Sequence, residues 1–469
     1  MARIEENIHK FKYPGAVDAD GHILEDAKLW ENYCEAKYKP DCVRVKEDEE
    51  GLEYLEIQGK PSRVSRKGTF SNIAAMGEVT RERGSFDPKR KYGQDVPLGA
   101  VDAKDRIKRL DLEGLKAAII YPSLALTWET ECDDADYAQA MCRAYNRWVS
   151  DWSSDSGGRL VPVAHLSLGD PKAAAQELER AVKAGHKGGW VVQFTMTRKP
   201  HAHPDHDVLF AKAQELDVPI GIHVSLEPQW AWPGRYSVDH VRKQHFFLNV
   251  TASDAIRHAL ASFMQYGTFD KFPKLKLVIL EVGAGWVSYW LDRMDAVYDS
   301  VIGRGVPLKE KPSYYFRRNV WVSADPDEHS LPAMMQLCGD DRFFWASDFP
   351  HPDHTGNYLE ELEELAEKLP ASSRANVLGD NVQRVYGLGC SDIRIRGARQ
   401  QRAPFSARVQ SVRDSHTVRL GTGSTPSLAS SAICLAAAAA SLSLSRASGG
   451  IGPTSSRFST GEAPPSPSF

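Results

Sequence analysis

Two imidazoles and two carboxylates stand at or near the ends of apolar runs that are typical of buried strands. A carboxylate at the edge of a core is costly unless a positive charge meets it, and a metal ion supplies such a charge. Imidazoles suit zinc and carboxylates favour harder ions, so the set predicts one divalent ion, with zinc ahead of manganese. The residues are Asp20 and His22 in "VDADGH", His223 in "GIHV" and Asp348 in "FFWASDF".

Three of these four residues could also be explained by a role in folding alone. A lone strand histidine such as His223 is more often a hydrogen-bonded core residue than a ligand. Asp20 could bond a loop amide, and Asp348 could cap a turn. However, the strand period of two places Asp20 and His22 on one face, and four such residues at strand ends are hard to explain by coincidence.

Two further residues near expected strand ends could move protons. Glu281 stands in "ILEVGAG", and His351 comes three residues after Asp348. A carboxylate beside a cation stays ionised, so we expect Glu281 to act as a general base, to orient a metal-bound water or to ligate the ion. We expect His351 to transfer protons or to support a metal ligand; the alternative is a loop histidine that fixes the turn between Pro350 and Pro352.

Other histidines and the tryptophans carry weaker signals. His165 falls within an expected strand and is interpreted as a hydrogen-bonded core residue. Three histidines in the proline-rich stretch "RKPHAHPDHD" are expected to be loop residues, with substrate contact as the alternative: His201, His203 and His206. Four tryptophans suit an aromatic or conjugated substrate, although they pack cores just as readily: Trp128, Trp190, Trp230 and Trp232.

Eight short apolar runs alternate with helical patterns and predict an α/β fold, a (β/α)8 TIM barrel. The C-terminal ends of its strands would carry the reactive residues. No glycine-rich phosphate loop follows the first strand to favour a Rossmann sheet. The expected strands are 16–22, 116–123, 160–168, 188–194, 218–226, 275–283, 319–325 and 343–349.

The expected barrel domain covers residues 1–389 and carries one insertion after its first strand. Two β-like arms flank an acidic turn at about 43–59, which predicts a hairpin that either covers one barrel end or decorates the surface. From residue 390 to 469 the chain has 17 serines, nine arginines and no lysine, so this low-complexity segment is expected to be a disordered tail.

Composition limits the partners. The formal net charge is −4 and the chain has no cluster of basic residues, so we expect it to bind a small-molecule substrate and no nucleic acid. The seven cysteines are scattered and lack a CxxC pair, which indicates a reducing cytoplasm. The N-terminus lacks an apolar signal core, and the stretch at 430–444 is short for a membrane span. A homodimer is also expected.

Five motifs, taken in order, resemble the amidohydrolase-related proteins of the family 2 type, a group that includes the γ-resorcylate, 5-carboxyvanillate and aminocarboxymuconate semialdehyde decarboxylases. They are D-x-H on the first strand, "GIHV", "EVGAGWVSYWLDRMD", "SDFPHPD" and "NVLGDNVQRVYGL". The resemblance spans nearly all of residues 14–389. It implies a barrel of the metal-dependent hydrolase type, with one ion held by Asp20, His22, His223 and Asp348.

The resemblance leaves the reaction open because of one departure. Those decarboxylases carry a histidine at the end of the sixth strand, where this chain has Glu281. The implied function is therefore decarboxylation of a small aromatic or conjugated carboxylate, or hydrolysis of a C–N, ester or C–C bond by a metal-bound water. A barrel that has lost its chemistry and serves as a binding module is a third possibility, which the retained ligand-type residues disfavour.

The composition of the tail generates a test of the domain boundary. Because residues 390–469 lack a core-forming pattern, a chain that ends at Gly389 is expected to keep the melting temperature and the activity of the full chain. Thermal unfolding followed by circular dichroism checks this. A clearly lower melting temperature of the shortened chain would show that the segment packs on the barrel.

Overall fold

The computed structural model describes most of the chain up to residue 389. The described residues are 7–78, 86–231, 245–352 and 356–389. The expected tail lies outside the described residues, as do Trp232 and Asp353.

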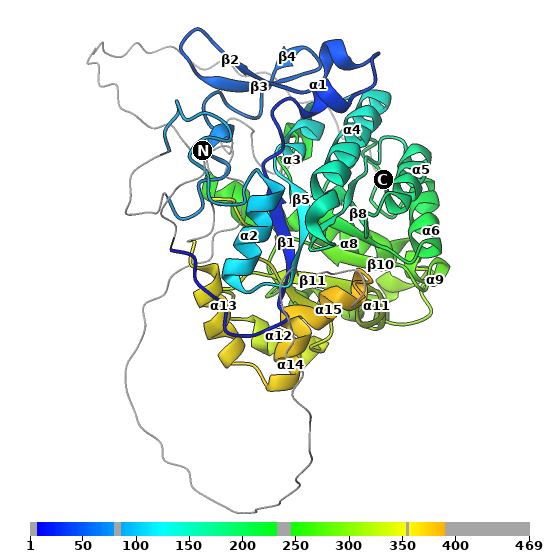
Figure 1. Cartoon of the computed structure of the whole chain (residues 1–469). Coiled ribbons are helices and arrows are strands. Elements are labelled where there is room, and N and C mark those ends of the chain that lie inside the picture. The colour runs from blue at the N-terminus through cyan, green and yellow to red at the C-terminus, as the bar shows by residue number, and fades with distance from the viewer. Residues whose placement is uncertain (1–6, 79–85, 232–244, 353–355, 390–469) are drawn as a thin grey trace, which may run out of the picture.

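Eight parallel strands form the barrel at the centre of the molecule (Figure 1). All eight expected strands are confirmed, and the third is interrupted at Val163, so that β6 and β7 are two parts of it. The strands are β1 Val17–Ile23, β5 Ala117–Pro122, β6 Leu160–Pro162, β7 Ala164–His165, β8 Gly189–Val192, β9 Pro219–His223, β10 Lys276–Ile279, β11 Val320–Ala324 and β12 Phe343–Trp345.

The barrel closes where its first and last strands meet. Hydrogen-bonded neighbours run from β1 through β5 to β6, and from β7 through β8, β9, β10 and β11 to β12. The amide of Asp348 donates to the carbonyl of Asp20 over 2.9 Å, and the amide of His22 donates to the carbonyl of Phe349 over 2.7 Å. The closing seam therefore runs through residues of the predicted metal site.

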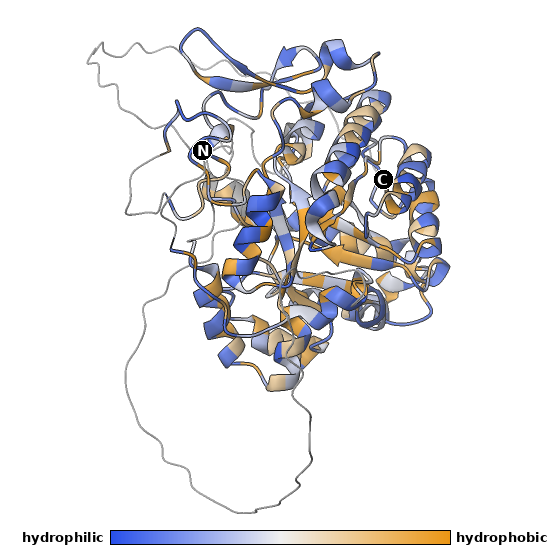
Figure 2. Cartoon of the chain, viewed as in Figure 1, coloured by the Kyte–Doolittle hydropathy of each residue, from blue (hydrophilic) through white to orange (hydrophobic). Residues whose placement is uncertain are grey.

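Side chains of the strands alternate between the barrel interior and the layer beneath the helices. In β5, Ala117, Ile119 and Tyr121 belong to the inner group of buried side chains, whereas Ala118 and Ile120 belong to the outer group. Figure 2 shows apolar strands at the centre of the molecule and hydrophilic helix faces outside. Both faces of each strand are buried, which is why these strands appear in the sequence as continuous apolar runs.

Helices follow most strands and cover the barrel. Asp102, Asp134 and Asp170 begin three of them, each accepting backbone N–H groups of the first turn. The longer helices are α2 Ala103–Glu113, α4 Ala135–Ser153, α5 Pro171–Lys183, α6 Asp207–Glu215, α8 His245–Gln265, α10 Val287–Asp299, α11 Pro312–Asn319, α12 Leu331–Cys338 and α13 Tyr358–Glu367. The short ones are α1 Leu29–Tyr33, α3 Ala125–Trp128, α9 Thr268–Lys271, α14 Ala371–Ala375 and α15 Asn381–Val385.

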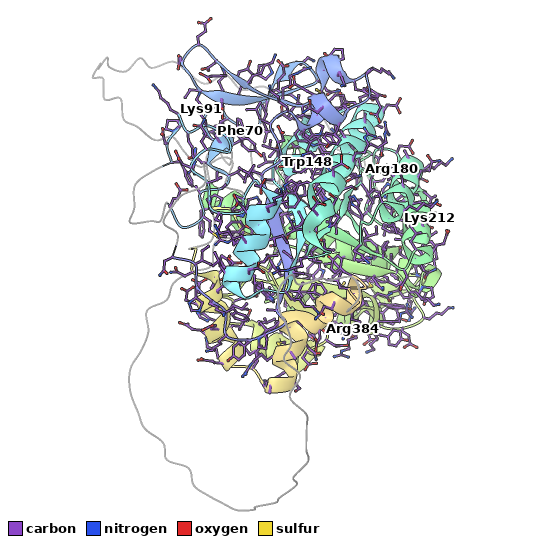
Figure 3. The ribbon with its side chains drawn as sticks, viewed as in Figure 1. Phe70, Lys91, Trp148, Arg180, Lys212 and Arg384 are labelled. Carbon is purple, nitrogen blue, oxygen red and sulfur yellow. The ribbon has the colours of Figure 1, made fainter. Side chains whose placement is uncertain are left out.

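The outer faces of the helices are charged. Lys212 on α6 lies 3.4 Å from Glu179 on α5, and Figure 3 shows Lys212 and Arg180 at the outside of the molecule. Among the described residues, no helix is both long enough and apolar enough to cross a membrane.

The insertion after β1 contains the expected hairpin. β2 Arg44–Glu47 and β3 Glu53–Ile57 pair antiparallel, and β4 Lys60–Pro61 extends the sheet. The amide of Arg63 donates to Glu131 over 2.7 Å, and that of Gln58 donates to the Tyr137 hydroxyl over 3.3 Å. Since both acceptors follow β5 in the chain, the sheet lies at the C-terminal end of the barrel (Figure 1).

Candidate metal centre

The C-terminal half of β1 places Asp20 and His22 on the barrel axis, and Gly21 makes this possible. The register of β1 against β5 shifts between Asp18 and Gly21. A Cβ atom on Gly21 would lie 2.6 Å from both Arg106 Nη2 and Asp18 Oδ2, distances that no real Cβ contact tolerates. A larger residue here would push aside the side-chain ends of Arg106 and Asp18, which lie against the strand.

Two backbone carbonyls fix the orientation of the histidines. Nδ1 of His22 lies 2.6 Å from the carbonyl oxygen of Pro122, and Nδ1 of His223 lies 2.6 Å from that of Val224. A carbonyl oxygen can only accept, so each Nδ1 carries the proton and donates. Each Nε2 is then left facing the centre, which is the arrangement that metal-binding histidines have in proteins.

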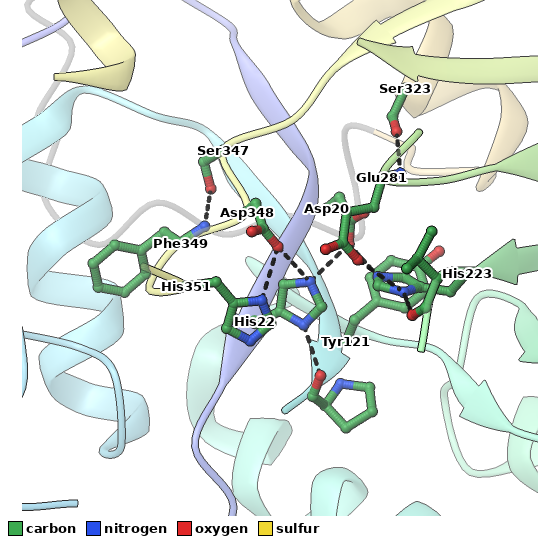
Figure 4. Close-up of polar contacts among 12 residues, drawn as sticks. Asp20, His22, Tyr121, His223, Glu281, Ser323, Ser347, Asp348, Phe349 and His351 are labelled. Carbon is green, nitrogen blue, oxygen red and sulfur yellow. Dashed lines mark hydrogen bonds and ion pairs between the residues drawn. The ribbon is translucent and has the colours of Figure 1, made fainter. Parts of the chain in front are cut away.

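The two carboxylates converge on these nitrogens (Figure 4). Oδ1 of Asp20 lies 3.3 Å from His223 Nε2 and 3.4 Å from His22 Nε2. Oδ1 of Asp348 lies 3.0 Å from His22 Nε2. The structure thus brings together all four predicted ligands, which come from β1, β9 and the segment after β12.

The donor set fits a divalent cation. Among the described residues, Oδ2 of Asp20 is buried without a hydrogen-bond partner. Burial raises the pKa of Asp20, but His223 and His22 outweigh it and hold that pKa below its usual range. Burial lowers the pKa of His22, yet Asp20 and Asp348 raise it well above the ordinary value. The carboxylates therefore attract positive charge, and a bound cation would take the place of a proton on His22.

Two residues of the site hold an unusual backbone conformation. Asp348 has a φ of 51° and Glu281 a φ of 57°, in the left-handed region that side-chain-bearing residues seldom adopt. The amide of Glu281 donates to the Ser323 hydroxyl over 3.1 Å. Such strain persists only where surrounding contacts hold it, and it clusters at functional sites.

A set of polar contacts that sequence reasoning missed supports β1 from behind. Asp18 accepts from both the amide and the hydroxyl of Ser347, at 2.9 and 2.6 Å. Arg106 donates to the carbonyl of His22 over 3.0 Å, and its guanidinium lies 4.4 Å from the Phe349 ring centre. No sequence signal could have paired a residue of α2 with these strand ends.

The predicted proton-transfer residues lie on opposite sides of the ligands. Oε2 of Glu281 lies 3.3 Å from Nδ1 of His223, the nitrogen that faces away from Asp20. His351 lies 3.0 Å from Asp348 Oδ1 through Nδ1 and 2.9 Å from the Ser123 hydroxyl through Nε2. Burial, with the nearby His22, lowers the pKa of His351 to about 4.

The remaining histidines lie apart from the centre. His165 is buried, contacts Glu129 at 3.1 Å and stacks on Trp190 with ring centres 4.1 Å apart. His201 and His206 contact the carbonyls of Val192 and His201, at 2.9 and 2.8 Å. Within the described part of the chain, the groups with metal-ligand spacing are Asp20 with His22 and His223, and His22 with Asp348 and His351.

The tryptophans divide between core and surface. Trp128 and Trp190 are fully buried, whereas Trp230 is 44% exposed and meets the Phe194 ring edge-on, with centres 6.0 Å apart. Of the described tryptophans singled out in the sequence, Trp230 alone is exposed, and the Arg198 guanidinium lies 4.6 Å from its ring centre.

The chain is similar in sequence to one known protein family and to a decarboxylase. Residues 120–388 match the family model described as Amidohydrolase. The γ-resorcylate decarboxylase of Polaromonas sp. (strain JS666) is 25% identical over 332 residues, which cover 67% of this chain and 96% of that protein.

Solved structures share the fold. An amidohydrolase from Mycobacterium avium subsp. paratuberculosis K-10 is 20% identical with a TM-score of 0.66, covering 80% of this chain and 99% of that one. The 5-carboxyvanillate decarboxylase of Novosphingobium aromaticivorans DSM 12444, complexed with manganese and 4-hydroxy-3-methoxy-5-nitrobenzoic acid, is 19% identical with a TM-score of 0.57, covering 80% and 96%.

The donor set generates a prediction about metal content. Wild-type protein is expected to retain one divalent ion per chain after dialysis, as measured by elemental analysis. Asp20→Asn and Asp348→Asn remove one negative charge each with little change of shape, so each is expected to weaken binding by roughly 10-fold or more.

A second buried histidine–carboxylate pair supplies the control. His165→Gln changes a histidine that contacts Glu129 but none of the four predicted ligands, so it is expected to keep the ion. Wild-type protein without stoichiometric metal, or full occupancy in both aspartate variants, would contradict the assignment.

Proposed function

The chain belongs to the amidohydrolase family of metal-dependent hydrolases and carboxy-lyases, and we propose that it decarboxylates a small aromatic carboxylate. The observation that carries the proposal is the convergence of Asp20, His22, His223 and Asp348 at the closing seam of the barrel. The decarboxylase relative that matches over 96% of its own length supports the choice of reaction. The substrate named for that relative, γ-resorcylate, makes a hydroxylated benzoate the first candidate.

We propose that the four residues hold one ion of manganese or zinc. When bound, the ion would supply a Lewis acid that holds the substrate carboxylate and a neighbouring oxygen. Manganese in the solved 5-carboxyvanillate decarboxylase favours manganese over the zinc that the ligand types first suggested. The expected homodimer and cytoplasmic location stay predictions.

Glu281 is the residue best placed to handle the proton. Decarboxylation breaks the bond between the ring carbon and the carboxylate, releases CO2 and places one proton on that carbon. Among the six predicted site residues, Glu281 has the largest exposed fraction, 7%, while the others are at most 2% exposed. An ionised Glu281 cannot donate, so in a decarboxylation it would first have to take up a proton from solvent and then pass it to a substrate that lies over the ligands.

Hydrolysis is the second candidate reaction, because Glu281 could also act as the base that it requires. An ionised carboxylate accepts protons readily, so Glu281 would also serve as the base for a water that attacks a carbonyl. The two reactions differ in their products, which makes them separable by direct assay.

An assay of products tests the reaction class. Protein loaded with manganese is expected to convert 2,6-dihydroxybenzoate or 5-carboxyvanillate into CO2 and the corresponding phenol, measured by chromatography and CO2 release. The same protein stripped with a chelator is the control and is expected to be inactive. Cleavage of ester or amide substrates without CO2 release from any hydroxybenzoate would favour hydrolysis instead.

Glu281→Gln tests the proton-handling role, because it keeps the shape of the side chain and removes its charge. Activity is expected to fall by roughly 10²- to 10⁴-fold while metal content holds. Glu129→Gln is the matched control, since Glu129 is a buried glutamate that contacts a histidine outside the centre. If Glu281→Gln keeps activity within a few-fold of wild type, Glu281 is structural.

A further inference from the structure

A buried chain of hydrogen bonds leads from Ser123 through His351 to Asp348. The Ser123 hydroxyl lies 2.9 Å from His351 Nε2. His351 Nδ1 lies 3.0 Å from Asp348 Oδ1, a contact that Figure 4 shows. All three residues are at most 2% exposed. We propose that Ser123 and His351 are positioning residues that hold Asp348 in the orientation needed to bind the metal ion, an inference that rests on the proposed function.

The chemistry of the three groups fixes the direction of both hydrogen bonds. A carboxylate accepts only, so the proton of the neutral His351 ring lies on Nδ1 and is donated to Asp348. Nε2 then carries a lone pair and accepts from the Ser123 hydroxyl. Removing the hydroxyl would release the ring to turn or to change tautomer, and the carboxylate would lose its donor.

Because both nitrogens of His351 are engaged, the ring has none to offer a substrate. The His351 ring also packs on a predicted ligand. Its centre lies 4.0 Å from the centre of the His22 ring, at an interplanar angle of 30°. His351 therefore touches two of the four ligands, one by hydrogen bond and one by packing. This geometry favours support of the ligands over proton transfer, the other role expected from the sequence.

Ser123 is itself held firmly. Its amide donates to Glu25 Oε2 over 3.2 Å, and the amides of Leu124 and Ala125 donate to the same carboxylate over 2.9 Å each. Glu25 follows β1, which carries Asp20 and His22, while Ser123 follows β5. The chain of contacts thus ties the ends of β1 and β5 to the segment after β12.

Affinity for Mn²⁺ tests the proposal without relying on activity. Competition with a chromogenic chelator gives the Kd of metal-free protein for Mn²⁺. Ser123→Ala and His351→Ala are expected to weaken binding by roughly 10- to 100-fold, the effect typical of losing a partner of a ligand. His351→Asn is expected to weaken binding less than His351→Ala, because its amide N–H can stand where Nδ1–H stands although it loses the contact with Ser123.

Ser167→Ala is the matched control, since Ser167 is a buried serine that donates to Glu129, outside the centre. The electron paramagnetic resonance spectrum of bound Mn²⁺ adds a readout that fold stability alone would not move, and it is expected to change in Ser123→Ala but not in Ser167→Ala. If His351→Ala does not fold, the comparison of Ser123→Ala with Ser167→Ala decides.

The results distinguish a failure of the proposed metal site from a failure of the positioning role. Wild-type protein that fails to bind Mn²⁺ and Zn²⁺ would overturn the proposed function, and this inference with it. Wild-type protein that binds Mn²⁺ tightly, with Ser123→Ala and His351→Ala binding equally well, would leave the metal site standing and overturn the positioning role.

Discussion

Two buried carboxylates at the seam of the barrel set the conditions for the rest of the site. One of the two backbone hydrogen bonds at this seam runs from the amide of Asp348 to the carbonyl of Asp20. Closing the barrel therefore brings two like charges together in a place without solvent, where repulsion and desolvation both oppose ionisation. The neighbouring histidines outweigh these costs and hold the pKa of both carboxyls below their usual range, and a cation at this point would stabilise the charges further.

The surrounding structure keeps these charges in place against local strain. The left-handed conformation of Asp348 and of Glu281 costs on the order of 1–3 kcal/mol each. Contacts from Asp18, Ser347 and Arg106 hold the ends of β1 and β12 next to Asp348. The hydrogen bond from the Glu281 amide to Ser323 holds the other position. The polar contacts behind β1 are therefore part of the site, although none of them faces the predicted position of the ion.

The sequence predicted the strands and all four candidate ligands, because both depend on local patterns. Continuous apolar runs marked the eight strands, and ionisable residues at their ends pointed to one face of the barrel. The contacts of Arg106 and Ser123 could not be predicted, because they join segments distant in the chain and leave no local pattern. The contact of Glu281 with Nδ1 of His223 likewise depends on a backbone conformation that the motif "ILEVGAG" does not specify.

The contact between Glu281 and His223 is one point at which this chain differs from the decarboxylases it resembles. The proton on Nδ1 of His223 goes to the Val224 carbonyl, and Glu281 Oε2 lies 3.3 Å from the same nitrogen. A negative charge this close to the far nitrogen of a histidine favours positive charge on that ring or on an ion bound to it. Glu281 is therefore placed to affect both the predicted ligand His223 and the proposed proton transfer. A proton delivered to a ring carbon would complete decarboxylation, whereas one delivered to a leaving group would complete hydrolysis.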